Sequence, residues 1–379
     1  MALGAGLSTR AVVKPVPRLR MKWVIPSASE NPFDDKKIVL PTHDNGTYDY
    51  HVDWGDGSSE DVTAIGNTSF AGTTLPGFFH TYSAAGTYYV TITGKIKGWS
   101  FNASASSFNS YKPKLKDVLE WGPLEIGPNP AGGSAREGAQ FKGCTGLTWS
   151  ATDRLHLGGN TNLTEMFSGC SALDANGLVN MNTSAVTSMK LMFYACDAFN
   201  KDFCPEFSSA GITAAKDGGL WGFMAALSNG VFNKAFPSAF TGNMNQNTDF
   251  GYFLYKQGSY NNSNIGQFNM SAAIDINYML HNCAAFNQNL AGWDISNVGG
   301  TFSGDGSATT DMSNFMTGAN ALSTSNYDYT LEYWGAASVQ NGVSISFGDA
   351  TYTGGSSAAT ARAHLVSSHS WTIYDGGEA

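Results

Sequence analysis

Apolar side chains recur at two spaced positions along the middle of the chain. The first position holds an aromatic, methionine or leucine residue, at Phe141, Phe167, Phe193, Met224, Leu254, Leu280 and Met316. The second position follows each of these, at Leu147, Leu173, Phe199, Phe232, Tyr260, Phe286 and Leu322. Self-similarity at a period of about 20 to 50 residues is typical of a solenoid, whose units stack because none can bury its apolar stripe alone. The spacing therefore predicts a repeat solenoid over residues 138–322.

Each predicted unit has an internal order. We expect a short helical turn from the first apolar position to a small residue or cysteine, and an extended piece after the second position. The cysteines of these segments are Cys144, Cys170, Cys196 and Cys283. Stacked coils would bring the first three within disulfide range, and the alternative is that they pack as small buried thiols.

A column of asparagines follows the second apolar position in four consecutive units. Its members are Asn200, Asn233, Asn261 and Asn287. Backbone donors in the turns of a solenoid need acceptors. We therefore expect these side chains to bond to the backbone of the neighbouring coil.

The segments that flank the repeats show other patterns. Apolar and polar residues alternate over residues 48–54 and 88–93, which predicts strands and a small β-sandwich over residues 21–98. Residues 99–137 read as a transition, in which a strand over 114–122 covers the first coil. Residues 323–379 read as a C-terminal cap with helices over 326–334 and 360–369 and a closing strand over 371–374, because a solenoid without a cap leaves its last coil open.

The first 20 residues read as an extended docking arm. Pro15 and Pro17 exclude helix, and the basic side chains of this region are Arg10, Lys14, Arg18, Arg20 and Lys22. We expect the arm to bind a partner protein in an assembly, and the alternative is a leader without a partner. No apolar run resembles a secretory signal or is long enough to span a bilayer.

Composition narrows the possible functions. The chain has 379 residues with 21 Lys and Arg against 30 Asp and Glu, a net charge of −9, whereas nucleic-acid binding needs clustered cations. The common motifs of metalloproteases, serine hydrolases and phosphate-binding loops are missing from the sequence, so we predict a protein that is not an enzyme.

Two sets of residues are candidates for ligand binding. Asp53 and Asp56 in the turn after the first strand pattern are candidate calcium ligands, and the alternative is that they satisfy donors of their own turn. No other cofactor is predicted. Aromatic residues are candidate ligand contacts, as platforms for sugars or patches for protein, with packing inside the coils as the alternative. These are Trp99, Tyr111, Tyr252, Tyr255, Tyr260 and Trp293.

Several segments resemble known families. TSMKLMFYACDAFN at 187–200, FNQ at 286–288, WDISNV at 293–298 and DMSNFM at 311–316 resemble the repeat of the BspA-like leucine-rich-repeat surface proteins, the group with mycoplasma-lipoprotein-type repeats. VDWGDGSS at 52–59 with HTYSAAGTYYVTITG at 80–94 resembles the polycystic-kidney-disease-type domain. The resemblance implies a mainly β fold with short helices: an immunoglobulin-like β-sandwich, then a leucine-rich-repeat-like solenoid with a C-terminal cap.

The resemblance also implies a function. Members without an export signal look like bacteriophage-encoded proteins of the virion, such as a capsid decoration, tail or fibre component that projects its solenoid for surface contact or host adhesion. The expected partners are other virion proteins, bound through the arm, and a host surface glycan or protein, with the chain as part of an oligomeric assembly. The alternatives are a bacterial cell-surface adhesin and a carbohydrate-binding or polysaccharide-degrading protein. The repeats at 219–270 depart from the family pattern.

Overall fold

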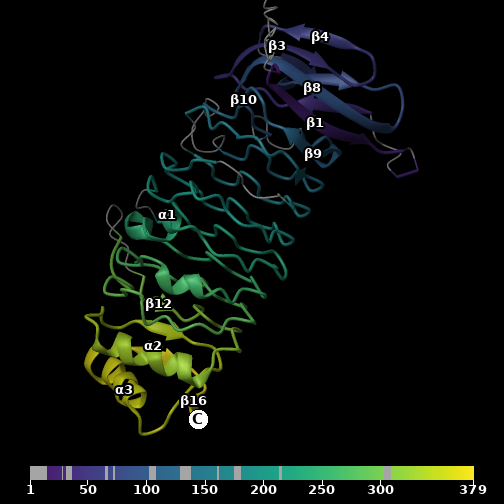
Figure 1. Ribbon diagram of the computed structural model, residues 1–379. Helices are drawn as coiled ribbons and strands as arrows, with labels where there is room; N and C mark the ends of the chain where they lie inside the picture. The colour runs from purple at the N-terminus through teal and green to yellow at the C-terminus, as the bar shows by residue number, and fades with distance from the viewer. Residues whose placement is uncertain are drawn as a thin grey trace, which may run out of the picture.

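The protein is an elongated molecule built from a sheet, a stack of coils and a helical end (Figure 1). A computed structural model describes residues 15–27, 29–30, 36–64, 67–70, 73–101, 108–128, 138–159, 162–174, 181–212, 216–302 and 309–379. The fold is mainly β with short helices, as the sequence predicts at this level.

The large sheet lies at the N-terminal end. Its strands run in the order β11-β9-β1-β8-β3-β4, with β10 paired to β8. They are β1 (Arg18–Ile25), β3 (Thr47–Asp53), β4 (Ser59–Val62), β8 (Gly86–Lys97), β9 (Leu115–Glu120), β10 (Leu124–Glu125) and β11 (Thr148–Trp149). Tyr48, Tyr50 and Val52 alternate with exposed residues along β3 and are buried. The alternation in the sequence therefore identified this strand correctly.

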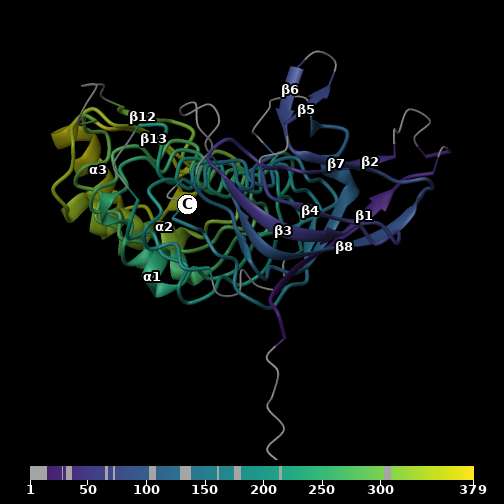
Figure 2. The same ribbon diagram turned by 90° about the horizontal axis from the view of Figure 1, so that it is seen from above.

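Two smaller strand pairs accompany the large sheet. They are β2 (Lys37–Leu40) with β7 (Phe78–Thr81), and β5 (Asn67–Phe70) with β6 (Thr73–Pro76). Phe78 of β7 packs edge-on against Tyr50 of β3, with ring centroids 6.2 Å apart. The β5–β6 pair projects away from the rest of the molecule (Figure 2). β7 and β8 are consecutive but pair with different strands, so they do not form a hairpin.

The predicted N-terminal arm was wrong in its extent. β1 begins at Arg18 and lies between β8 and β9 inside the sheet. Arg18 pairs with Glu120 at 2.8 Å, and the Arg20 guanidinium lies 5.2 Å from the centroid of the Tyr89 ring. Because these cations and Lys22 belong to a central strand, they are held on the sheet surface. The other two basic residues of the predicted arm, Arg10 and Lys14, lie outside the described residues.

The sheet passes directly into the coils. β9 pairs antiparallel with β1 and parallel with β11, a strand of the first coil. The predicted strand over 114–122 is confirmed as β9. A single cluster of buried side chains runs from Leu19 in the sheet to Ile373 near the C-terminus, so the sheet and the stack share one hydrophobic core.

Alternate backbone N–H groups join each coil to the next. The N–H groups of Leu191 and Phe193 donate to the carbonyls of Trp221 and Phe223, both at 2.9 Å, while Tyr194 N–H turns back to Leu191 at 3.1 Å. These N–H groups alternate between the next coil and their own turn, whereas an α-helix bonds each N–H to the carbonyl four residues back, so the predicted helical turn was wrong. Leu191 adopts a left-handed φ of 53°, which costs about 1–2 kcal/mol and directs donors toward the next coil.

Both predicted apolar columns lie inside the stack. All fourteen side chains are buried. The rings of Phe141, Phe167 and Phe193 stack on one another with centroids 5.7 and 5.5 Å apart and interplanar angles of 11° and 25°. Offset stacking of this kind adds to the burial of apolar area. The rings of successive coils therefore form a continuous ladder along the core.

The cysteines pack as small buried thiols, the alternative to disulfides given by the sequence. All five cysteines are free and buried, and the thiols of Cys170 and Cys196 donate to the carbonyls of Phe141 and Phe167 at 3.1 and 3.0 Å. Burial raises the pKa of the Cys170 thiol to about 12. The interpretation as small buried thiols is confirmed.

The asparagine column forms the ladder that the sequence predicts. Oδ1 of Asn200, Asn233 and Asn261 accepts the backbone N–H of the next asparagine in the column at 2.9, 2.8 and 2.8 Å. Asn287 ends the series and accepts from Ser323 N–H at 2.9 Å. Each amide therefore satisfies a backbone donor of the following coil.

The C-terminal end covers the last coil. It contains α2 (Thr324–Ala336), α3 (Ser357–His369), β12 (Asp311–Met312), β13 (Ser344–Ser346), β14 (Thr351–Tyr352), β15 (Thr372–Tyr374) and β16 (Gly377–Glu378). Short helical segments elsewhere are α1 (Ser238–Thr241), η2 (Lys112–Lys114), η3 (Met244–Gln246) and η4 (Ser263–Gln267). Trp334 of α2 donates its indole N–H to the carbonyl of Leu290 at 3.1 Å. The two predicted helices and the closing strand are confirmed.

Candidate contact surface

Most of the aromatic residues predicted as ligand contacts are in the core. Trp99, Tyr111, Tyr260 and Trp293 are buried, which matches the alternative of packing inside the fold and not a role as ligand contacts. Trp293 donates its indole N–H to the Ile265 carbonyl at 2.8 Å. These rings fill space between coils or at the junction with the sheet, where burial of a large ring contributes most. Tyr252 and Tyr255 are half-buried and reach the surface.

Tyr252 and Tyr255 belong to a larger group of half-buried rings. Trp221, Tyr252, Tyr255, Tyr278 and His281 lie on three consecutive coils and contact one another. We call these five rings the aromatic strip. Tyr252 N–H donates to the carbonyl of Asn277 at 3.1 Å, so the inter-coil ladder sets the spacing of the strip.

Two tyrosines of the strip occupy strained backbone positions. The φ angles of Tyr252 and Tyr278 are 59° and 58°. A left-handed conformation is uncommon for a residue of this size and costs about 1–2 kcal/mol. Glycine occupies the equivalent position at Gly222, so the backbone alone does not require an aromatic residue there.

Ring stacking runs along the axis of the stack. Tyr252 and Tyr278 stack with centroids 4.5 Å apart at 13°, and Tyr255 and His281 stack at 5.3 Å and 16°. Trp221 meets Tyr252 at 5.2 Å and 53°. Because each of these rings packs against a ring of an adjacent coil, ring edges and hydroxyl groups are the parts most available to a partner.

Two lysines border the strip. Lys190 Nζ lies 4.9 Å from the centroid of the Trp221 ring, and Lys256 Nζ lies 5.1 Å from that of Tyr255. Such cation–π contacts stabilise exposed pairs by about 0.5–1 kcal/mol. Burial lowers the pKa of His281, and the nearby charge of Lys256 also lowers it, so the imidazole is neutral at neutral pH. The strip is thus an uncharged aromatic surface between two cations.

The sequence held a signal for the strip residues that the prediction missed. Tyr252 and Tyr278 each stand two residues before a first apolar position, and Tyr255 and His281 each stand one residue after it. A count of outward positions relative to the apolar column would have grouped these four. Trp221 stands at a different offset, in the degenerate part of the repeats, and only the structure brings it to the strip.

The candidate calcium ligands are occupied by their own turn. Asp53 accepts the N–H of Gly55 at 2.8 Å, and Asp56 accepts the N–H of Ser58 at 3.0 Å. His80 Nε2 lies 2.8 Å from the other carboxylate oxygen of Asp56. This geometry matches the alternative interpretation of the two aspartates. Across the described residues, no three His, Cys, Asp or Glu side chains are grouped to hold a metal ion.

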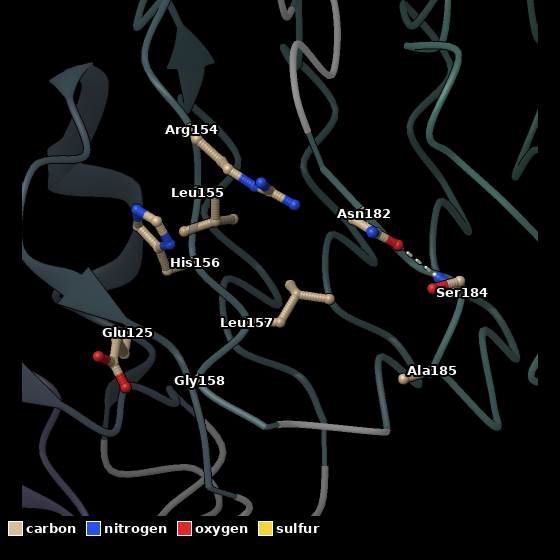
Figure 3. A pocket seen from close by; sticks show the side chains of 9 residues that line it. All are labelled: Glu125, Arg154, Leu155, His156, Leu157, Gly158, Asn182, Ser184 and Ala185. Atoms are coloured by element: carbon tan, nitrogen blue, oxygen red, sulfur yellow. Dashed lines mark hydrogen bonds between the residues drawn. The ribbon is translucent and has the colours of Figure 1, made fainter.

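An open depression of about 390 Å³ lies where β10 meets the first coils (Figure 3). Its lining consists of Glu125, Arg154, Leu155, His156, Leu157, Gly158, Asn182, Ser184 and Ala185. Arg154 reaches across it toward Asn182, which accepts the N–H of Ser184 at 3.0 Å (Figure 3). Among the described lining residues, Glu125 is the one carboxylate, and it pairs with Lys97 at 3.2 Å.

Comparison with known proteins identifies one family resemblance. A family model described as "Mycoplasma protein of unknown function, DUF285" matches residues 139–214 and 230–328. Both segments lie in the coils, so this match is consistent with the mycoplasma-type repeat inferred from the sequence. No curated protein and no solved structure matches the chain. Within the described parts of the chain, none of the helices has the length and apolar character needed to cross a bilayer.

Proposed function

We propose that this protein is a contact protein without catalytic activity, in which the stack of coils holds the aromatic strip toward a protein partner. The proposal includes the finer architecture: an immunoglobulin-like sandwich over residues 21–98, a transition over 99–137, a leucine-rich-repeat-like solenoid over 138–322 and a cap over 323–379. The mycoplasma-type repeat match supports the solenoid. The strand order of the large sheet and the β2–β7 pair support the sandwich.

The aromatic strip is the observation that carries the proposal. Tyrosine and tryptophan are enriched among the residues that dominate protein–protein binding. Trp221, Tyr252 and Tyr278 are half-buried and already ordered by stacking. A preordered surface loses little conformational entropy when it binds. Covered ring faces favour a protein, which contacts edges and hydroxyls, over a sugar stacked on the rings.

The proposed setting is a bacteriophage particle, as a capsid decoration, tail or fibre component. The N-terminal residues, including Arg10 and Lys14, would dock on another virion protein, and the stack would project outward for adhesion to a host. A bacterial cell-surface adhesin is the alternative setting. Both settings use the same property, a scaffold whose interior is filled and whose binding groups are on its surface.

Fractionation tests the setting. Mass spectrometry of purified particles, of the cell-surface fraction and of the cytosol from a producing culture would locate the chain. We expect it in particles, and removal of residues 1–14 should abolish its incorporation. Recovery in the cell-surface fraction alone would favour the adhesin, and particles that retain the shortened chain would exclude docking by the arm.

A second experiment tests the strip. Purified protein carrying Tyr252→Ala and Tyr278→Ala should bind intact host cells at least tenfold more weakly than the unaltered protein. Protease treatment of the cells should abolish binding, whereas periodate oxidation of their glycans should leave strip-dependent binding in place. Tyr374→Ala is the matched control, because Tyr374 is 52% exposed on β15, away from the strip. Equal binding by the strip variant and the control would refute the proposal.

A further inference from the structure

A groove of about 320 Å³ lies between α2 and the last coil. Its lining is Asn289, Ala291, Gly292, Tyr329 and Tyr333. We call it the cap groove. It lies at the end of the molecule opposite the large sheet (Figure 1). A distal groove of this kind is accessible to a ligand on another surface when the N-terminal end is docked.

Two tyrosines of α2 form one side of the cap groove. Tyr329 and Tyr333 are 54% and 62% exposed. They are four positions apart in the sequence, so both lie on one face of the helix, one turn apart. The opposite face of α2 buries Tyr327, Leu331 and Trp334 against the core. The helix is thus held firmly and presents two aromatic rings outward.

The rings of the cap groove differ from those of the aromatic strip. Among the described residues, neither Tyr329 nor Tyr333 stacks with another ring or accepts a cation over its face. Each strip tyrosine, by contrast, has a ring of an adjacent coil stacked against it. The faces of Tyr329 and Tyr333 therefore remain free for a ligand.

The other side of the groove consists of two small residues, Ala291 and Gly292, and one amide, that of Asn289. Gly292 must stay without a side chain, because a Cβ there would lie 2.7 Å from the carbonyl oxygen of Gly266. Asn289 is exposed. Within the described parts of the chain, its amide and the hydroxyls of the two tyrosines make no hydrogen bond. The Asn289 amide, which can both donate and accept hydrogen bonds, thus lies beside the two exposed tyrosine rings.

Charge around the groove selects the ligand class. Residues 258–379 contain nine acidic side chains and one basic side chain, Arg362. Arg362 pairs with Asp375 at 2.7 Å, and Asp328 and Glu332 on α2 accept hydrogen bonds from Thr353 and Ser357. A surface of this sign repels anions. The groove therefore has no cation to offer a sulfated, phosphorylated or carboxylated chain.

We propose that the cap groove binds a neutral oligosaccharide. Tyr329 and Tyr333 would stack on the apolar faces of two successive sugar rings, since an exposed aromatic ring has both an apolar body and a polar tip. The Asn289 amide and the tyrosine hydroxyls would exchange hydrogen bonds with sugar hydroxyls, which are donors and acceptors at once. This inference rests on the proposed function as a contact protein and adds a ligand class and a second site.

Calorimetric titration of the full chain with soluble oligosaccharides tests the inference. The neutral probes are hexamers of β-1,4-glucose, α-1,4-glucose and N-acetylglucosamine, and the anionic probe is an oligomer of galacturonic acid. We expect saturable binding of at least one neutral hexamer and none of the anionic oligomer. Failure of all three neutral hexamers to bind, or preference for the anionic oligomer, would overturn the inference.

Variants then locate the site. Tyr329→Ala and Tyr333→Ala should each weaken binding at least tenfold, whereas Tyr333→Phe should retain most of it because the ring face remains. Tyr374→Ala and the strip variant Tyr252→Ala should bind as the unaltered protein does. Unchanged affinity in both alanine variants would refute the groove. If the strip variants lose cell binding but the unaltered protein binds no oligosaccharide, the inference about the cap groove fails and the proposed function stands. The two proposals therefore fail separately.

Discussion

Single side chains make the connections between coils. Asn261 Oδ1 accepts both the N–H of Asn287 and the Nε2 of Gln288 at 2.8 Å. Removal of the amide leaves a backbone donor of the next coil without its partner, in a position where water replaces it incompletely. The column therefore contributes to stability as well as to register.

Asn261→Ala should lower the free energy of unfolding by about 1–3 kcal/mol. Urea denaturation followed by circular dichroism measures this change. Asn289→Ala is the matched control, because Asn289 is exposed and makes no hydrogen bond to the described residues, and its effect should stay within about 0.5 kcal/mol. Equal destabilisation by the two variants would show that the ladder is not specific.

Phe193→Ala should destabilise the protein more than any change in the asparagine column. Phe193 is buried with its ring 5.5 Å from Phe167 and 5.4 Å from Phe223. Truncation of a buried phenylalanine removes its burial and leaves a cavity, at a cost of about 3–5 kcal/mol. The same urea experiment measures it, and a loss below that of Asn261→Ala would contradict the role of the ring ladder.

At the scale of the coil, two carboxylates stand at successive corners, that of Asp249 buried and that of Asp275 half-buried. Asp249 accepts the N–H groups of Gly251 and Asp217 at 2.8 and 2.6 Å, and Asp275 accepts the N–H of Asn277 at 2.6 Å. The two aspartates form a parallel bridge between adjacent coils. Burial raises the pKa of Asp249 to about 7, with a further contribution from the charge of Asp275, and burial raises the pKa of Asp275 to about 6.

Stability should fall as pH rises from about 4 to about 7. The folded chain keeps protons on these groups that the unfolded chain releases near the ordinary pKa of 3.8, so each group lowers stability by up to about 1.4 kcal/mol per pH unit within its window. Asp275→Asn should flatten this fall between pH 4 and 6 and raise stability at pH 8. Urea denaturation of both proteins at pH 4.5, 6 and 8 gives the difference.

Asparagine is a fitting replacement at this corner. Asn162 stands at an equivalent corner of an earlier coil, where its Oδ1 accepts the N–H of Thr164 at 2.9 Å. The turn bond is therefore kept while the charge is removed. If the difference in unfolding free energy between Asp275→Asn and the unaltered protein does not change with pH, the Asp275 carboxylate is not the source of the pH dependence.

At the scale of the whole molecule, the cap closes a stack that would otherwise end in an open coil. Thr330 of α2 accepts the N–H of Leu290 at 3.0 Å, and Asn326 donates to Asn287 Oδ1 at 2.8 Å. Residues 323–379 carry five acidic side chains against one basic side chain, Arg362. The cap therefore supplies both an end to the core and a charge that opposes self-association.

Removal of residues 323–379 should cause self-association. The deletion uncovers Leu290 and leaves the backbone N–H groups of Leu290 and Met316 without their partners Thr330 and Ser346. An uncovered end of a repeat array templates contacts with other chains. Size-exclusion chromatography with light scattering measures the mass. The full chain with Tyr333→Ala is the control, and a monomeric truncated protein at the same concentration would contradict the prediction.

Much of this fold could be predicted from local spacing, and the surface could not. Phe193 and Asn261 repeat at positions that a reader of the sequence can align, and both have the predicted roles. Tyr260 and Tyr252 are equally aromatic, but the first stacks against Phe232 inside the core while the second reaches the surface. The difference depends on which face of the coil each residue occupies. The prediction assumed a helical turn, so it could not assign residues to the inner or outer face correctly.

The sequence by itself determined that the chain stacks, because the two apolar columns cannot be buried within any single unit. It also indicated α2 and α3, because their helical spacing is local. Only the tertiary structure decided which rings remain available to a partner, because the exposure of a ring depends on what the next coil or helix places against its face. The position of Arg18 also depends on tertiary pairing. It was predicted in the arm, but it belongs to β1, a central strand between β8 and β9.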